Sequence, residues 1–412
     1  MRLIALCVLL AAQASKTSDP KALDWFQFRG PNRDGLSNDT GLLQQWPSSG
    51  PPQLWKAAGI GTGYSGVCVS GNRVFTLGES NGKSFLVASN VADGKMLWKT
   101  PIGAPGGDRG AGPRSTPATD GAIVVALSQA GELVGVQAAT GRQIWANNME
   151  RMGGQRPNFW WSESPLIDGN LVVVTPGGSG GVVALAKVSG QRVWQAKVKG
   201  EAHYTSLAVA EIGGIRQYLA LTHDSVSGIA ARNGAIAWTA EPAWRKEAGL
   251  QVNAVAATPV YKDGTLFISA GYGAGHSAFR VAGAGGRFQI LDAYKGKELE
   301  NHHGGMIVVG DHVYGTNNTA LVCMELKTGK VLWQNRCVGK GSVAFADGHL
   351  IVRGEQGGVA LVEASPAAYK EKGQFNVTRS GGEGAWANPV VSGGKLYIRD
   401  WDNLFCYDLK AK

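Results

Sequence analysis

Residues suited to ligand binding and proton transfer recur along this chain, each just ahead of a short apolar run. Arg114 lies in the segment Gly112-Pro113-Arg114-Ser115-Thr116-Pro117, and His302 and His303 adjoin each other before two glycines. The other candidates at equivalent places are Trp161, Glu163, His203, Asn253 and Trp386. Arginine pairs with carboxylates, indoles stack on planar rings, and carboxylate and amide oxygens ligate hard cations. The set therefore predicts a site for a planar anion.

Within that site we expect Arg114 to pair with the anion and Trp161 or Trp386 to stack on its ring. Glu163 with Asn253 would ligate a calcium-type cation. A histidine such as His203 or His303, or the carboxylate of Glu163, would accept a proton in catalysis. Each of these residues also has an alternative, purely structural role. Arg114 would cross-link loops, Trp161 would pack between sheets, and Glu163 would accept hydrogen bonds from backbone N–H groups. Metal binding by His302 and His303 alone is not expected, because neighbouring side chains in an extended segment point opposite ways.

The elements that must position these side chains are short repeated strands. A glycine followed four residues later by tryptophan occurs at Gly94/Trp98, Gly141/Trp145, Gly190/Trp194, Gly234/Trp238 and Gly329/Trp333. The first four tryptophans are 44 to 49 residues apart, which is the length of a four-stranded propeller blade. The last interval is twice as long and predicts a hidden blade, with Glu300 at the tryptophan position.

A second signal, an apolar strand with an Asp-Gly or Gly-Gly turn, runs in phase with the first and occurs eight times. Alternation and tight turns indicate antiparallel sheet. The fold class is therefore all-β: an eight-bladed propeller of four-stranded antiparallel blades. The last blade runs out of chain before its outer strand. We expect Gln53-Leu54-Trp55-Lys56 to supply that strand and close the ring.

Composition supports one repeat domain. Glycine makes up 60 of 412 residues, about twice its usual share of roughly 7%. A glycine-rich insertion in the hidden fifth blade, from Ser269 to Gly286, predicts mobile or bulged connections beside the channel. Its His276 and Arg280 are secondary ligand candidates.

The charged and sulfur-containing residues exclude several classes of function. The net charge is +9, but the lysines and arginines are scattered among acidic residues and form no cluster. We therefore expect no nucleic-acid partner. Cys323 and Cys406 share one repeat position and predict small buried strand residues. The chain has no CxxC or CxxCH motif, so neither haem nor zinc is expected. We expect a monomer.

The N-terminus has the pattern of an export signal. Arg2 precedes an apolar run that ends in Ala12-Gln13-Ala14, a small-x-small cleavage pattern. The predicted organisation is a signal peptide at 1–14, an extension at 15–50 and the propeller at 51–412. The apolar run is too short to span a bilayer, so no transmembrane segment is expected. We predict an exported protein, periplasmic or extracellular.

The repeats resemble the tryptophan-docking repeats of quinoprotein dehydrogenases, the pyrroloquinoline quinone (PQQ) repeat, over nearly the whole mature chain. Leu321-Val322-Cys323-Met324-Glu325-Leu326-Lys327-Thr328-Gly329-Lys330-Val331-Leu332-Trp333 carries the resemblance. The opening segment from Trp25 to Gly35 also looks like the start of exported bacterial PQQ-like propellers. The resemblance implies PQQ and calcium as candidate ligands. The family's adjacent cysteines and haem motif are absent, and related propellers serve as protein-docking surfaces.

Two functions follow from this resemblance. The first is a module that binds a small ligand or an exported protein partner at the channel mouth. The alternative is a periplasmic PQQ-dependent dehydrogenase that oxidises an alcohol, sugar or polymer hydroxyl. A polysaccharide hydrolase or lyase, using the histidine pair and Glu163, is a third reading with no motif behind it. Whether the protein is an enzyme stays open at this point.

Overall fold

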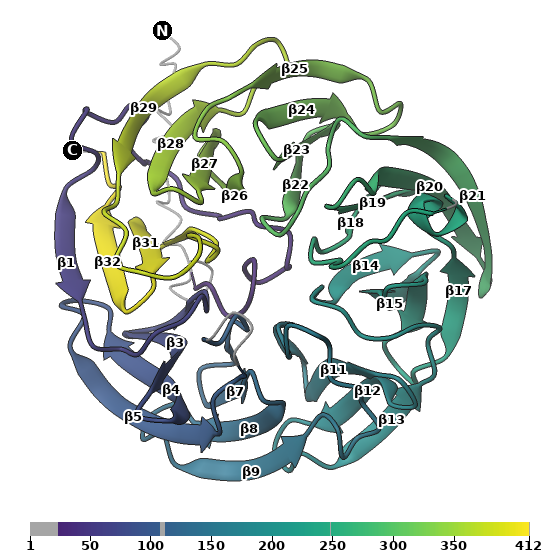
Figure 1. Ribbon diagram of the computed structural model, residues 1–412, viewed down its shortest axis with the longest axis horizontal. Helices are drawn as coiled ribbons and strands as arrows, with labels where there is room; N and C mark the ends of the chain where they lie inside the picture. Colours follow the sequence, from purple (N-terminus) through teal and green to yellow (C-terminus); the bar gives the residue numbers. More distant parts are fainter. Residues whose placement is uncertain (1–23, 108–111, 248, 412) are drawn as a thin grey trace, which may run out of the picture.

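The computed structural model describes residues 24–107, 112–247 and 249–411. It confirms the all-β propeller: eight four-stranded antiparallel sheets stand in a ring around a central channel (Figure 1). The export signal expected at 1–14 lies outside the described residues. Within those residues, no helix has the length and apolar character needed to cross a membrane.

Each blade runs from an inner to an outer strand. The first three blades are β2 (Cys68–Ser70), β3 (Arg73–Ser80), β4 (Lys83–Asn90) and β5 (Met96–Gly103); β6 (Ala118–Thr119), β7 (Ile123–Leu127), β8 (Glu132–Gln137) and β9 (Gln143–Asn148); β10 (Leu166–Asp168), β11 (Leu171–Gly177), β12 (Gly181–Ala186) and β13 (Arg192–Ala196). The next two are β14 (Ala208–Ile212), β15 (Ile215–Leu221), β16 (Val226–Ala230) and β17 (Ile236–Ala240); β18 (Val260–Lys262), β19 (Thr265–Ala270), β20 (Gly275–Ala284) and β21 (Arg287–Gly296).

The last three blades complete the circle. They are β22 (Met306–Val309), β23 (His312–Thr316), β24 (Leu321–Glu325) and β25 (Val331–Asn335); β26 (Gly341–Ala346), β27 (His349–Gly354), β28 (Gly358–Glu363) and β29 (Glu371–Asn376); β30 (Val390–Ser392), β31 (Lys395–Asp400) and β32 (Asn403–Asp408), with β1 (Gln53–Ala57) on the outside. Between β17 and β18 the chain forms a short 3-10 helix, Ala243–Lys246.

The closing strand is the one that the sequence predicts. β1 pairs antiparallel with β32, and Trp55 lies opposite Cys406. Trp333 lies opposite Cys323 in the sixth blade, so the two cysteines do share a repeat position, and both are buried. Because the first strand pairs into the last blade, the ring closes without a covalent link.

The repeated tryptophans join each blade to the next by one recurring contact. The indole of Trp98 packs on Gly141, where a β-carbon would lie 2.6 Å from the ring, and its N–H donates to the Ala138 carbonyl at 3.1 Å. The backbone at Gly141 has φ +72°, which favours glycine. The same approach of tryptophan to glycine occurs at Trp55/Gly94, Trp145/Gly190 and Trp194/Gly234.

In the hidden fifth blade the docking residue is Tyr294. The Tyr294 ring packs on Gly329, and its hydroxyl donates to the Leu326 carbonyl at 2.6 Å. Tyr294 also pairs with Ala278 across the sheet, the register that Trp98 has with Ala88. The expectation that Glu300 holds this position is wrong, because β21 is a longer strand and its docking residue precedes Gly296.

The glycine-rich insertion in this blade is mostly strand. β20 and β21 form a long hairpin that turns at Gly285 and Gly286, so its second half is not a connection beside the channel. His276 is 2% exposed and stacks on Phe267, with 5.1 Å between ring centroids. Arg280 donates to the Lys327 carbonyl at 2.7 Å. Both residues support packing between strands and blades.

The segment from Trp25 to Leu42 crosses the centre of the ring and holds several blades together (Figure 1). It forms isolated bridges with the first, seventh and eighth blades, at Trp25–Val69, Leu36–Phe345 and Leu42–Lys410. Arg33, 2% exposed, donates to carbonyls of the third and fourth inner-strand entries: Ser164 at 3.0 Å, Pro165 at 3.1 Å and Leu207 at 2.6 Å. This segment therefore closes one end of the channel.

Candidate functional site

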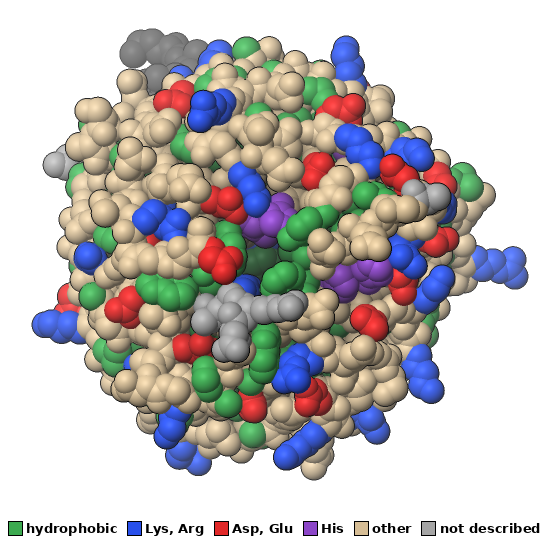
Figure 2. All heavy atoms as spheres, in the orientation of Figure 1, with side chains coloured by type: hydrophobic (Ala, Val, Ile, Leu, Met, Phe, Trp, Pro, Cys, Tyr) green, Lys and Arg blue, Asp and Glu red, His purple; other side chains and the backbone are tan. Residues whose placement is uncertain are grey.

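A cavity of about 340 Å³ opens at the centre of the propeller, where Figure 2 shows a hollow with histidine and hydrophobic side chains around it. Six aromatic side chains give it apolar walls: Phe28, Tyr64, Phe159, Tyr204, Tyr272 and Trp386. Its charged and polar groups include Arg114, His302, His303, Glu383 and Asn388, with Ser162, Ser164 and Ser206. This mixture of apolar walls and a few convergent polar groups is typical of small-molecule sites.

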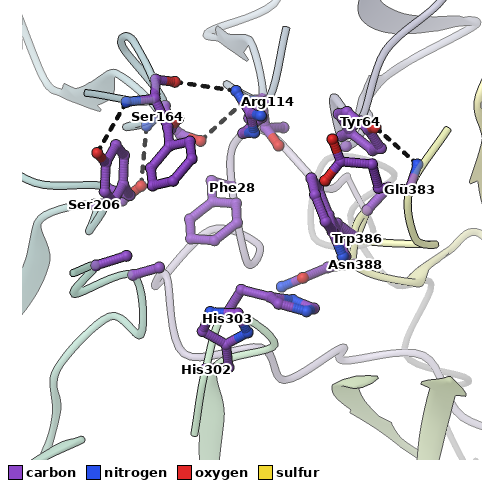
Figure 3. A pocket seen from close by; sticks show the side chains of 18 of the residues that line it. Phe28, Tyr64, Arg114, Ser164, Ser206, His302, His303, Glu383, Trp386 and Asn388 are labelled. Atoms are coloured by element: carbon purple, nitrogen blue, oxygen red, sulfur yellow. Dashed lines mark hydrogen bonds between the residues drawn. The ribbon is translucent and has the colours of Figure 1, made fainter. Parts of the chain in front are cut away.

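The segments that enter the inner strands supply most of this lining, as the sequence predicts. Tyr64 precedes β2, Arg114 precedes β6, Tyr204 precedes β14, and the histidine pair precedes β22. The entry segments converge because every inner strand starts at the same end of the ring. Phe28 comes from the crossing segment and lies in the middle of the view in Figure 3, between Arg114 and the histidine pair.

Among the described residues that line the cavity, Arg114 is the arginine. Its guanidinium carbon lies 5.5 Å from the Tyr64 ring centroid and 5.6 Å from that of Trp386. One guanidinium N–H donates to the Phe159 carbonyl at 3.1 Å. Burial lowers the pKa of Arg114, while the nearby Tyr64, Glu383 and Tyr204 act to raise it. The guanidinium charge is therefore held among aromatic faces and is less hydrated than a charge at the surface. In this environment an anionic ligand stabilises the charge more than it would at the surface.

Tyr64 and Trp386 form the wall beside Arg114. Their ring centroids are 4.3 Å apart with an interplanar angle of 32°, and Figure 3 shows both next to Glu383. The Trp386 indole N–H donates to Oε1 of Glu355 at 2.8 Å. The wall is therefore fixed from behind, which preorganises an aromatic surface for a ligand.

Next to Trp386, His302 and His303 both line the cavity, with 5.2 Å between their ring centroids and 5.8 Å between the centroids of His303 and Trp386. The expectation that the two side chains point opposite ways is wrong, because the chain bends at His303 and Gly304 instead of staying extended. Nε2 of His303 lies 2.5 Å from Oε1 of Glu355. Burial lowers the pKa of His302 to about 4, helped by the charges of His303 and Lys340. His302 is therefore neutral at neutral pH.

Trp161 and Glu163 do not reach this cavity. Trp161 is 1% exposed and belongs to the core between the second and third blades. Glu163 is 3% exposed and accepts the Thr175 N–H at 2.7 Å. Their neighbours Ser162 and Ser164 line the cavity instead. Alternate residues of an extended segment face opposite sides, and here the serines take the cavity side.

His203 and Asn253 line a second cavity of about 300 Å³, away from Arg114. Nδ1 of His203 accepts the Val255 N–H at 3.0 Å, and the His203 ring lies 4.7 Å from that of His223. Burial lowers the pKa of His203 to about 4, and the charge of His223 lowers it further. The structure therefore does not bring Asn253 together with Glu163, the pair expected to ligate calcium.

Sequence reasoning missed several residues of the site, among them Phe28, Tyr272, Glu355 and Glu383. Tyr272 and Glu355 lie in loops between the second and third strands of their blades, a class of loop that the search for entry segments leaves out. The sequence shows the opening segment that contains Phe28 as a stretch rich in aromatic residues and arginine. Its position in the channel, however, is set by tertiary packing and cannot be read from the sequence. A search for charged residues in the loops between the second and third strands of each blade would have identified Glu355.

The fold, the docked repeats and the central site define a PQQ-repeat β-propeller. The family model described as outer membrane protein assembly factor BamB matches residues 82–335, more than half of the chain. The chain belongs to this family.

Two curated proteins are similar to parts of the chain. Tetrathionate hydrolase of Acidithiobacillus ferrooxidans is 24% identical over 340 residues, which cover 79% of this chain and 56% of the relative. BamB of Xanthomonas campestris pv. campestris is 28% identical over 172 residues, 40% of this chain and 39% of the relative. The match spans about half or less of each relative's length.

Among solved structures, BamB from Moraxella catarrhalis superposes with a TM-score of 0.63 at 17% identity. The superposition covers 87% of this chain and 100% of that chain. At this identity the likeness establishes the fold alone.

Proposed function

We propose that this protein is an exported propeller that binds a small anion in its central cavity. The observation that carries the proposal is the placement of Arg114 against the rings of Tyr64 and Trp386, inside a cavity closed at one end by Phe28. A guanidinium held in this way gains more from an anionic partner than one in water, because it has already lost hydration.

The size and lining of the cavity support a compact ligand. A volume of about 340 Å³ lies at the lower end of the roughly 300–1,000 Å³ range of small-molecule sites. Glu383 faces the same space (Figure 3), so a ligand that also carries a hydroxyl or amine would contact the Glu383 carboxylate as well. The two similar curated proteins suggest what to test as a ligand or partner. One acts on tetrathionate, a small dianion, and the other is an assembly factor.

A PQQ-dependent dehydrogenase is the second candidate, and one observation favours it. Arg114 beside aromatic rings suits a flat polycarboxylate such as PQQ, and His303 with Glu355 offers a group that accepts a proton. For calcium, the oxygen donors of the described lining are the Glu383 carboxylate, the Asn388 amide and serine hydroxyls. When bound, the quinone would supply the two-electron oxidation, while these residues would orient it.

The test is a titration of the purified mature protein with PQQ and with tetrathionate, each with and without calcium, followed by tryptophan fluorescence. We expect saturable binding of at least one anion. Arg114→Gln should weaken it by about tenfold to a hundredfold, the loss of a charge-assisted hydrogen bond. Trp386→Leu should weaken it by about threefold to tenfold.

The matched control is Arg192→Gln, which removes an exposed arginine on the outer strand β13. This variant should bind like the unmodified protein. If neither anion binds, or if Arg192→Gln weakens binding as much as Arg114→Gln, the central anion site is refuted. A substrate-dependent reduction of a dye by the PQQ-loaded protein would favour the dehydrogenase.

A further inference from the structure

A cluster of metal-ligating groups lies next to Trp386. The ligand atoms of His302, His303 and Glu355 all lie within 4.8 Å of one another. Nδ1 of His302 is buried and has no hydrogen-bond partner among the described residues. Figure 3 shows the two rings side by side at the cavity. Buried polar atoms without partners are rare in proteins and call for an explanation.

We propose that His302, His303 and Glu355 bind a first-row divalent metal ion such as Zn²⁺, with the remaining coordination positions open to the central cavity. This site opens into the same cavity as the anion site and shares Trp386 with it, but none of its three ligands belongs to the anion site. Two imidazoles and one carboxylate are a donor set used by Zn²⁺ and its neighbours in the first row. The sequence gives no hint of it, because Glu355 lies 52 residues after His303.

The close contact between His303 and Glu355 is the core of the site. Nε2 of His303 and Oε1 of Glu355 are 2.5 Å apart and form a hydrogen bond in the metal-free protein. On binding, the metal ion takes the hydrogen-bonded position on Nε2, and the imidazole stays neutral by carrying its proton on Nδ1 instead. Ligand atoms at about 2.0–2.2 Å from a tetrahedral ion lie roughly 3.4 Å apart, so His303 and Glu355 separate by about an ångström while His302 moves closer, which side-chain rotations allow.

The groups around the cluster prepare it for a cation. The Trp386 indole N–H holds Oε1 of Glu355 at 2.8 Å, as the outer partners of metal ligands do.

One neighbour opposes the metal. Nζ of Lys340 lies 3.3 Å from Oε1 of Glu355 and repels a second cation. This contact gives the proposal a distinctive consequence: Lys340→Gln should strengthen metal binding, whereas loss of any ligand should weaken it. A site made by scattered surface histidines would not respond to Lys340.

The experiment uses the mature protein without a histidine tag. Zn²⁺ is titrated by calorimetry, and Co²⁺ is added separately to record its visible absorption, which reports the coordination geometry. We expect one ion per chain at micromolar affinity or better. His303→Gln and Glu355→Gln should each weaken binding at least about tenfold, and Trp386→Phe by about tenfold through the lost outer hydrogen bond.

His312→Ala, which alters a histidine on β23 outside the cavity, is the matched control. Thermal unfolding without metal checks that each variant is folded, and His302→Ala replaces any variant that is not. The proposal is overturned if no ion binds, if His312→Ala weakens binding as much as His303→Gln, or if Lys340→Gln weakens it. Anion binding at Arg114 is measured separately, so failure of one site does not decide the other.

Discussion

The docking of Tyr294 on Gly329 allows a sharp test of how the blades are held together. Gly329 and Gly339 both have φ +75°. A β-carbon on Gly329 would lie 2.5 Å from Cδ2 of Tyr294, whereas a β-carbon on Gly339 would meet nothing within 4 Å. Alanine at either position strains the backbone, but only alanine at Gly329 also clashes with the neighbouring blade. Comparing the two variants therefore separates these two contributions.

The magnitudes follow from these two contributions. Alanine in the left-handed region costs roughly 1–2 kcal/mol, so Gly339→Ala should lower the free energy of unfolding by about that amount. Gly329→Ala adds an overpacking cost of about 1–3 kcal/mol. The Tyr294 ring cannot easily move aside, because its hydroxyl donates to the Leu326 carbonyl at 2.6 Å.

The measurement is urea unfolding followed by tryptophan fluorescence, compared at equal m-values. Tyr294→Ala removes the clash, so the double variant Tyr294→Ala/Gly329→Ala should show a coupling of about 1–3 kcal/mol. Equal losses for Gly329→Ala and Gly339→Ala, or no coupling with Tyr294→Ala, would refute the claim that Tyr294 replaces the missing tryptophan.

Three further changes have expected outcomes. Deleting Gln53–Ala57 exposes the edge of β32 and should cause loss of the folded state or aggregation, seen by size-exclusion chromatography. Burial raises the pKa of Glu163 to about 7, while Thr175 and Arg33 act to lower it. The folded state therefore binds the proton more tightly, so stability should fall by roughly 3 kcal/mol as pH rises from about 4.5 to 7. Glu163→Gln should flatten that part of the pH profile of the urea midpoint, and an unchanged profile would contradict the burial argument. Arg33→Met should destabilise by about 3–5 kcal/mol, because it leaves three buried carbonyls without their donor, whereas the exposed Arg192→Met should change stability by less than about 0.5 kcal/mol.

The sequence by itself determined the architecture. Turn glycines and docking tryptophans are local signals that return at a fixed interval, and each interval is one blade, so the number of blades and the closing strand could be read directly. Arg114, Trp386 and the histidine pair could also be placed at the channel mouth, because the entry to every inner strand lies at the same end of a propeller.

Only the tertiary structure decided which of those loop residues meet. The direction in which each side chain points depends on the local path of the chain. Ser162 and Ser164 line the cavity, whereas Glu163 between them is buried. A bend at His303 brings two neighbouring histidines to one wall. Phe28 and Glu355 reach the site from distant segments, and no spacing in the sequence encodes that approach. Tyr294 escaped recognition for the same reason, since a different aromatic ring in a longer strand fills the same space between two blades.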